Sequence, residues 1–137
     1  MIVADTGAIL ALVDAGDAHH QAVRHVYDEH AAHWVLPWAI LPEVDYLLGR
    51  HVSARARRLF LDDVAAGAFA VEWGEAADLE RAAALDRTYA KLGLGLVDAV
   101  VMAVAERLDA DAIATVDLRH FGAVSLATKP RLLPRDA

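Results

Sequence analysis

Short apolar segments alternate with longer helical patterns along the whole chain. The helical patterns follow a 3.6-residue period or are apolar over most of their surface. We expect helices at residues 6–16, 18–31, 40–49, 54–66, 75–93 and 96–108. Between them we expect strands at residues 1–5, 33–37, 68–73 and 111–117, and a weaker final strand at 122–128. This alternation predicts an α/β protein: a three-layer α/β/α fold with a central, mainly parallel sheet.

Local signals predict where several helices begin and end. Asp17 and Ser53 carry side chains that commonly cap a helix N-terminus. Gly16, Gly49 and Gly67 are expected to end the helices that precede them.

The composition suits one folded domain spanning residues 1–137. Hydrophobic residues make up 57% of the chain, so burial can outweigh chain entropy. The chain has no cysteine, which excludes disulfides and thiolate metal sites and fits the reducing cytoplasm. No apolar run reaches the roughly 20 residues of a membrane span. The first residues lack a basic segment and include Asp5, so we expect no signal peptide, no membrane contact and a cytoplasmic protein.

The net charge of −7 argues against a nonspecific nucleic-acid binder, because such proteins present a basic surface. The acidic residues are not in one block, however. If several of them surround a divalent cation, the local field changes sign. The overall charge therefore leaves nucleic acid open as a partner.

Four acidic residues stand at the edges of apolar elements. Asp5 and Asp117 end two predicted strands, Asp98 lies near the start of an apolar helix, and Glu43 lies in the first turns of another. In parallel sheets, ligands bind at the carboxyl ends of the strands. We therefore expect these four carboxylates to meet there.

Gathered carboxylates are well suited to a hard divalent cation. Like charges in a partly desolvated site raise one another's pKa values, and a cation removes that repulsion. Mg²⁺ and Mn²⁺ take oxygen ligands, at about 2.0–2.2 Å for Mg²⁺. A cation held in this way can activate a water and stabilise charge on a phosphodiester. Hydrolysis by such a water leaves a 5′-phosphate and a 3′-hydroxyl.

Structural roles compete with the metal-site interpretation at each position. Asp5 and Asp98 are also suitable helix caps, and Glu43 is a first-turn acid that the helix dipole favours. Asp117 is also an ordinary turn residue after a strand.

Four segments carry a family resemblance. In chain order they are "VADTGAIL", "LPEVDYLL", "GLVDAVVMAVAERL" and "IATVDLRHF". They resemble the four motifs of PIN domains, and the similarity is greatest to the small VapC-type toxins of bacterial toxin–antitoxin pairs. The opening Asp-Thr pair, and the Thr-x-Asp followed by an aromatic residue at Phe121, are the most specific parts.

The resemblance implies a single PIN domain that acts as a Mg²⁺- or Mn²⁺-dependent endoribonuclease and is inhibited by a cognate antitoxin. Its acidic quartet matches four residues and its supporting hydroxyls match two: Asp5, Glu43, Asp98 and Asp117, with Thr6 and Thr115. One departure is visible, because the run at residues 93–97 before the third acid contains no Ser or Thr.

Other features leave alternatives open. Arg55, Arg57 and Arg58 form either a solvated helix face or a rim that contacts phosphates. Arg119 and His120 are close enough in sequence to Asp117 to reach a phosphate beside a metal. The apolar stretch at residues 35–48 is partly core, and the remainder suits an antitoxin groove or a homodimer face.

Two other classes with acidic pockets at strand ends fit poorly. A phospho-accepting receiver domain needs a second acid beside the first and an Asp after a middle strand, but residues 51–63 are helical and basic. Haloacid-dehalogenase-like phosphatases need Asp-x-Asp, whereas Asp5 is followed by Thr6 and Gly7. A PIN fold kept for binding alone, or a PIN nuclease without an antitoxin, is the remaining alternative.

Overall fold

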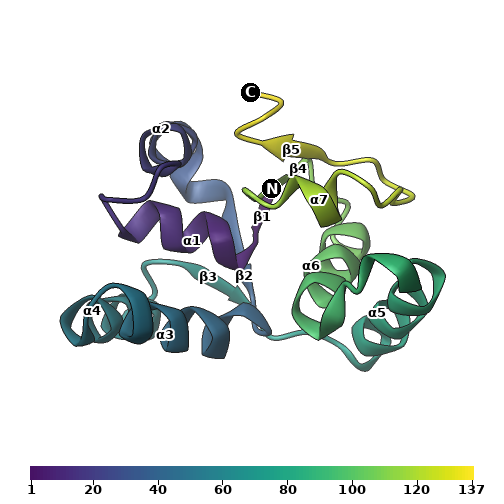
Figure 1. The fold of residues 1–137 in the computed structure, drawn as a ribbon, viewed down its shortest axis with the longest axis horizontal. Coiled ribbons are helices and arrows are strands. Elements are labelled where there is room, and N and C mark those ends of the chain that lie inside the picture. The colour runs from purple at the N-terminus through teal and green to yellow at the C-terminus, as the bar shows by residue number, and fades with distance from the viewer.

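A single sheet of five strands forms the centre of the molecule in the computed structural model, which describes residues 1–137 (Figure 1). All neighbouring strands are parallel, and their order across the sheet is β3-β2-β1-β4-β5. The strands are β1 (Ile2–Ala4), β2 (Trp34–Pro37), β3 (Ala70–Glu72), β4 (Ala112–Ala114) and β5 (Arg131–Leu133).

Helices cover both faces of this sheet. The α-helices are α1 (Thr6–Val13), α2 (His20–His30), α3 (Ile40–His51), α4 (Ala54–Ala65), α5 (Ala76–Thr88), α6 (Gly95–Arg107) and α7 (Leu118–Phe121). Two short 3-10 helices, η1 (Ala31–His33) and η2 (Ala90–Leu92), follow α2 and α5. In Figure 1, α1 to α4 lie to the left of the central strands, and α5 and α6 lie to the right. The predicted three-layer α/β/α fold is therefore confirmed. None of the helices combines the length and the apolar character that crossing a bilayer requires.

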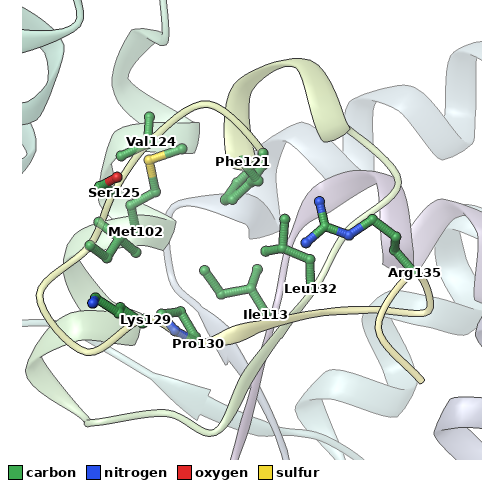
Figure 2. A pocket seen from close by; sticks show the side chains of 11 residues that line it. Met102, Ile113, Phe121, Val124, Ser125, Lys129, Pro130, Leu132 and Arg135 are labelled. Atoms are coloured by element: carbon green, nitrogen blue, oxygen red, sulfur yellow. The ribbon is translucent and has the colours of Figure 1, made fainter.

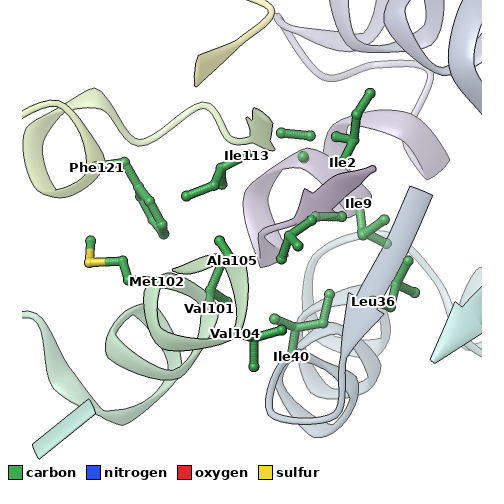
Figure 3. Packing of buried hydrophobic residues seen from close by; sticks show 14 of the residues in the cluster. Ile2, Ile9, Leu36, Ile40, Val101, Met102, Val104, Ala105, Ile113 and Phe121 are labelled. Atoms are coloured by element: carbon green, nitrogen blue, oxygen red, sulfur yellow. The ribbon is translucent and has the colours of Figure 1, made fainter. Parts of the chain in front are cut away.

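The core explains why the strands are short and apolar. All three residues of β1 and of β4 are buried, because helices cover both faces of these central strands. Figure 3 shows Val101 and Val104 of α6 pointing toward the strands, with Ile9 of α1 beyond them. These three side chains are fully buried, and each such burial stabilises the fold by about 1.5–3 kcal/mol.

The strand order creates a crevice between β1 and β4. From β1 the chain adds β2 and β3 on one side, and then returns to add β4 and β5 on the other side. The connections after β1 and β4 therefore leave in opposite directions. In open α/β sheets, such a switch point at the carboxyl ends of the strands is where ligands bind.

The predicted final strand is wrong. Residues 122–128 form no strand, and β5 is instead Arg131–Leu133, which pairs with β4. Leu132 and Leu133 are both buried, whereas Leu126 is the only buried residue of the 122–128 segment. The sheet edge therefore takes the pair of leucines, and residues 122–130 become a connecting loop.

Several helix boundaries also differ from the predictions, and the helix predicted at 75–93 ends at Thr88, with a separate 3-10 turn at Ala90–Leu92. The first helix ends at Val13 rather than Gly16, and the second begins at His20. The Asp17 carboxylate accepts a 2.7 Å hydrogen bond from the His19 amide, so it stabilises the turn before the helix instead of capping it. Gly49 lies inside α3, where a Cβ would stand 3.1 Å from Cδ of Arg57, so this glycine permits close packing.

The predicted cap at Ser53 is confirmed. Its Oγ accepts a 3.0 Å hydrogen bond from the Ala56 amide at the start of α4.

Candidate active site

Asp5 follows β1 directly and lies at the edge of the sheet where the strands end. Only 4% of the residue is exposed. Its Oδ1 accepts a 2.7 Å hydrogen bond from the Thr6 amide, and its Oδ2 accepts a 2.9 Å bond from the Thr115 hydroxyl. Asp5 therefore caps helix α1, as the structural alternative predicted. Each of its two carboxylate oxygens also accepts one hydrogen bond.

Thr115 joins the ends of β1 and β4. Besides donating to Asp5, its hydroxyl accepts a 3.0 Å hydrogen bond from the Asp117 amide. The side chain is buried, and the residue follows the last position of β4. One hydroxyl thus fixes the Asp5 carboxylate relative to the backbone that carries Asp117.

A glycine permits this close approach. Gly7, in the first turn of α1, lies so near β4 that a Cβ would stand 2.8 Å from Cγ2 of Val116. Real Cβ atoms essentially never show such a contact, so any larger residue would push α1 away from Thr115 and Asp117.

Asp117 is the N-cap residue of the short helix α7, and His120 lies within that helix. The Asp117 Oδ1 accepts a 3.1 Å hydrogen bond from the His120 amide, so Asp117 caps α7. The His120 ring points back to the acids. Its Nδ1 lies 2.6 Å from Oδ2 of Asp98 and 3.4 Å from Oδ2 of Asp117.

Asp98 enters the cluster from the first turn of α6. It does not cap that helix, because Leu94 occupies the N-cap position. One ligand-type atom from each of Asp98, Asp117 and His120 lies within 4.8 Å of the other two. Two carboxylates and an imidazole, drawn from α6 and α7, therefore converge near Asp5.

The acids affect one another's pKa values. Burial, the neighbouring Asp98 and then Asp117 raise the pKa of Asp5 to about 7, although the hydrogen bonds from Thr115 and Thr6 oppose the shift. Burial also raises the pKa of Asp98, with Asp117 and Glu43 adding repulsion against the favourable contact with His120. The contact with Asp98 in turn raises the pKa of His120.

Glu43 is the fourth predicted acid of the site. It occupies the first turn of α3, and its side chain makes no hydrogen bond or ion pair. Its charge contributes to the raised pKa of Asp98, so it lies near enough to act on that carboxyl. The converging ligand atoms come from Asp98, Asp117 and His120, whereas Asp5 acts on the neighbouring acids through its charge and is held by Thr6 and Thr115.

Thr6 has an unusual position for a hydroxyl. The residue is 5% exposed, and its Oγ1 is buried without a hydrogen-bond partner. Buried polar atoms are nearly always paired, so a free hydroxyl beside Asp5 is an available donor or acceptor for a ligand.

The donor set fits a divalent cation. Carboxylates whose pKa values are raised by burial and by one another are sites where a bound cation would relieve both penalties. Oxygen donors dominate, which suits Mg²⁺ or Mn²⁺, and the single imidazole is also compatible with Mn²⁺. Asp5, Asp98 and Asp117 are the residues that would hold the ion, with the free Thr6 hydroxyl beside them.

The structure resolves part of what the sequence left open. His120 contacts Asp98 instead of standing free, and Arg119 next to it is exposed and unpaired. The only sign of the histidine's role in the sequence is its position one helical turn after Asp117. In the arginine cluster, Arg57 pairs with Asp45 at 3.1 Å, while Arg55 and Arg58 are exposed.

Comparison with known proteins places this geometry in a family. The sequence pattern of the PIN domain matches residues 2–125. Ribonuclease VapC26 of Mycobacterium tuberculosis (strain ATCC 25618 / H37Rv) is 33% identical over 123 residues, which are 90% of this chain and 91% of that protein.

Two solved structures share the fold. VapC20 of Mycobacterium tuberculosis, described as a toxin that cleaves the sarcin–ricin loop, superposes with a TM-score of 0.83 at 23% identity, over 93% of this chain and 98% of its own. FitAcB of Neisseria gonorrhoeae superposes with a TM-score of 0.62 at 16% identity, over 96% of both chains. Motifs, fold and relatives agree, and the chain belongs to the PIN-domain family, in its VapC-type branch.

Proposed function

We propose that this protein is a Mg²⁺- or Mn²⁺-dependent endoribonuclease and the toxin of a toxin–antitoxin pair. The observation that carries the proposal is the convergence of Asp5, Asp98 and Asp117 at the β1–β4 switch point, with the pKa of Asp5 raised to about 7. A relative that shares 33% of its residues over most of both chains is named a ribonuclease. We place its action in the cytoplasm, where cellular RNA is accessible to it.

The contacts of each acidic residue suggest its role in holding the cation. Asp5 is a fixed ligand, because Thr6 and Thr115 hold one oxygen each. Asp98 and Asp117 approach from α6 and α7 and complete the set. Asp5, Asp98 and Asp117 would hold a divalent cation, which would supply the Lewis acidity that activates a water and offsets the charge that develops on the phosphodiester.

The second group of residues tunes the acids. Thr115 orients Asp5 and the Asp117 backbone together. The contact with Asp98 raises the pKa of His120, so its protonated ring would offset the repulsion between Asp98 and Asp117 when no cation is bound. Glu43 adds negative charge near Asp98, where it can orient a water.

The partner of the proposed toxin is a cognate antitoxin, and a homodimer stays a prediction. Tyr46 on α3 is 67% exposed within the apolar 35–48 stretch, so part of that stretch is available for a partner.

A nuclease assay tests the enzymatic part of the proposal. The purified protein is expected to cleave end-labelled RNA with Mg²⁺ or Mn²⁺, to lose cleavage in excess EDTA, and to leave 5′-phosphate ends. Asp98→Asn is expected to lose at least 100-fold in rate. The matched control is Asp62→Asn, which removes an exposed, unpaired acid on α4.

Retained cleavage in EDTA, or an Asp98→Asn variant as active as Asp62→Asn, would contradict the proposal. RNA binding without cleavage under all conditions would favour the alternative of a PIN fold kept for binding.

Expression in a bacterial host tests the toxin part. Induction of the wild-type chain is expected to arrest growth, and co-expression of the product of a small adjacent gene is expected to relieve the arrest. A harmless wild-type chain that still cleaves RNA in vitro would support a PIN nuclease without an antitoxin.

A further inference from the structure

A cavity of about 230 Å³ opens beside the candidate active site, on the α6 side of the sheet. Its walls come from α6, the end of α7, strands β4 and β5, and the loop at residues 122–130 (Figure 2). Because that edge of the sheet is covered by this loop rather than by a helix, the layer over β4 and β5 is incompletely filled. The proposed catalytic residues do not line the cavity.

The cavity and the acidic cluster share two helices. Met102 lies four residues after Asp98 on α6, and Phe121 lies four residues after Asp117 on α7. Side chains four apart on a helix are neighbours, about 5–6 Å between their Cβ atoms. Each helix that carries an acid therefore presents its next turn to the cavity.

The inner wall is apolar and aromatic. Met102, Ile113 and Leu132 are buried, and the ring of Phe121 points into the space between them (Figure 2). Flat heterocycles bind on such surfaces, because unstacked RNA bases stack on aromatic rings and pack against apolar side chains.

The rim carries polar and cationic groups. Lys129 stands at one end of the cavity and Arg135 at the other, with Ser125 at the side (Figure 2). Lys129 is exposed and makes no ion pair. Its φ of +48° lies in the left-handed region that glycine or asparagine adopts more easily.

The Arg135 guanidinium is held in place. Its Nε and Nη2 donate to the Asp136 carboxylate at 2.7 and 2.9 Å, and that carboxylate accepts a bond from the Leu132 amide. The remaining nitrogen, Nη1, lies 3.7 Å from where a Cβ on Gly122 would stand. A fixed guanidinium plane with one free edge can stack on a base or donate to it.

We propose that this cavity binds one nucleobase of the RNA substrate, with Lys129 contacting the phosphate of the same nucleotide. The inference rests on the proposed ribonuclease function and assigns the cavity to the recognition of a nucleotide near the cleaved bond. The volume suits one heterocycle, since drug-sized ligands occupy about 300–1,000 Å³. The unpaired cation complements a phosphate, and the shared helices α6 and α7 connect the cavity to the acids.

Binding of mononucleotides tests the cavity without requiring cleavage. The ¹⁵N-labelled protein is titrated in EDTA with AMP, CMP, GMP and UMP separately, and with inorganic phosphate. At least one nucleotide is expected to shift the amide resonances of residues 121–126 and 129–132 at lower concentration than phosphate does. No shift from any nucleotide, or equal affinity for phosphate alone, would overturn the inference.

Lys129→Asn provides a variant that folds readily, because asparagine relieves the left-handed strain. It is expected to weaken nucleotide binding at least threefold, while Lys129→Arg is expected to retain it. Arg131→Gln, which removes one exposed cation on β5 outside the cavity, is the matched control and is expected to bind as the wild type does.

Cleavage mapping connects the cavity to the substrate. With Lys129→Asn, and with Ser125→Phe to fill the mouth, sequenced 5′ ends are expected to show a relaxed nucleotide preference at one position near the cut. An unchanged cleavage pattern in both variants would overturn the inference and leave the ribonuclease function intact. If no variant and no wild-type sample cuts RNA, the proposed function fails, whereas the mononucleotide titration still decides whether the cavity binds a base.

Discussion

The Thr115 hydroxyl donates a 2.9 Å hydrogen bond to the Asp5 carboxylate, and this buried bond joins residues 110 positions apart in the chain. It connects the ends of β1 and β4, where the strand order reverses. The same hydroxyl oxygen accepts a hydrogen bond from the Asp117 amide, so it links Asp5 to Asp117.

Thr115→Val removes this oxygen while keeping a β-branched shape. The Asp5 carboxylate and the Asp117 amide both lose a buried partner, so we expect a loss of about 1–3 kcal/mol in the free energy of unfolding. Urea denaturation measures it. Thr115→Ser is the control that keeps the hydroxyl, and a valine variant as stable as the serine variant would show that the bond is unimportant.

Asp5→Asn is expected to stabilise the metal-free protein at high pH. The pKa of Asp5 is about 7 in the folded state, against 3.8 for an unperturbed aspartate, so folding favours its protonated form. The stability that this provides is complete below pH 3.8 and is lost as the pH rises through 7.

Asparagine removes that dependence. A shift of about three pKa units corresponds to about 4 kcal/mol, and the variant loses part of the hydrogen bonding, so we expect a net gain of about 1–3 kcal/mol at pH 8.5. Urea denaturation in EDTA at pH 5 and pH 8.5 measures the difference. A variant less stable than the wild type at pH 8.5, or an advantage that is larger at pH 5, would contradict the raised pKa.

His120→Ala is expected to destabilise the metal-free protein mainly at low pH. The contact with Asp98 raises the pKa of His120, so its contribution is complete below the usual value of 6.5 and is lost as the pH rises through the raised value. We expect a loss of about 1 kcal/mol at pH 6 and less at pH 9. Thermal unfolding in EDTA at the two pH values measures it, with the exposed His25→Ala on α2 as the control. Equal losses at both pH values would argue against a charged His120.

A divalent cation is expected to stabilise the wild-type protein through the acid cluster. A ligand that binds only the folded state raises stability by about 2.7 kcal/mol at 100 times its dissociation constant. Mn²⁺ is therefore expected to raise the melting temperature of the wild type and of Asp62→Asn, and to leave that of Asp98→Asn nearly unchanged. An equal rise in all three proteins would place the bound ion elsewhere.

The ion pair between Arg107 and Asp78 is expected to contribute to the free energy of unfolding and not to the activity of the candidate site. Asp78 is 2% exposed and accepts two bonds from the Arg107 guanidinium, at 2.7 and 3.0 Å. Arg107→Met leaves this buried carboxylate without a cation and with only the Glu75 amide as a hydrogen-bond donor, so we expect a loss of about 3 kcal/mol in urea denaturation. The more exposed pair of Arg81 with Glu106 is the control, and Arg81→Met is expected to lose less than about 1 kcal/mol. Similar losses in the two variants would show that the burial of Asp78 does not increase the contribution of Arg107 to stability.

The layered fold was predictable because it depends on local patterns. Buried runs such as residues 2–4 and 112–114, separated by helical periods, indicate a parallel sheet without knowledge of any contact. The end of the sheet was not predictable in the same way. Choosing between residues 122–128 and 131–133 depends on which side chains fit against β4, and this is a tertiary property.

The candidate site shows the same division. The rule that ligands bind at strand ends, applied to acids at the edges of apolar elements, identified Asp5, Glu43, Asp98 and Asp117, and the family motifs match the same four. The absence of Glu43 from the converging group, and the contact of His120 with Asp98, depend on how α3 and α7 are oriented. Sequence spacing does not specify those orientations. The roles of all these residues in catalysis stay predictions.

Anomalous diffraction from crystals soaked in Mn²⁺ tests most directly whether the acids share one cation. We predict a strong anomalous peak between the carboxylates of Asp5, Asp98 and Asp117, absent from crystals of Asp98→Asn. Peaks confined to exposed acids elsewhere, in crystals of a protein that cleaves RNA, would contradict this account.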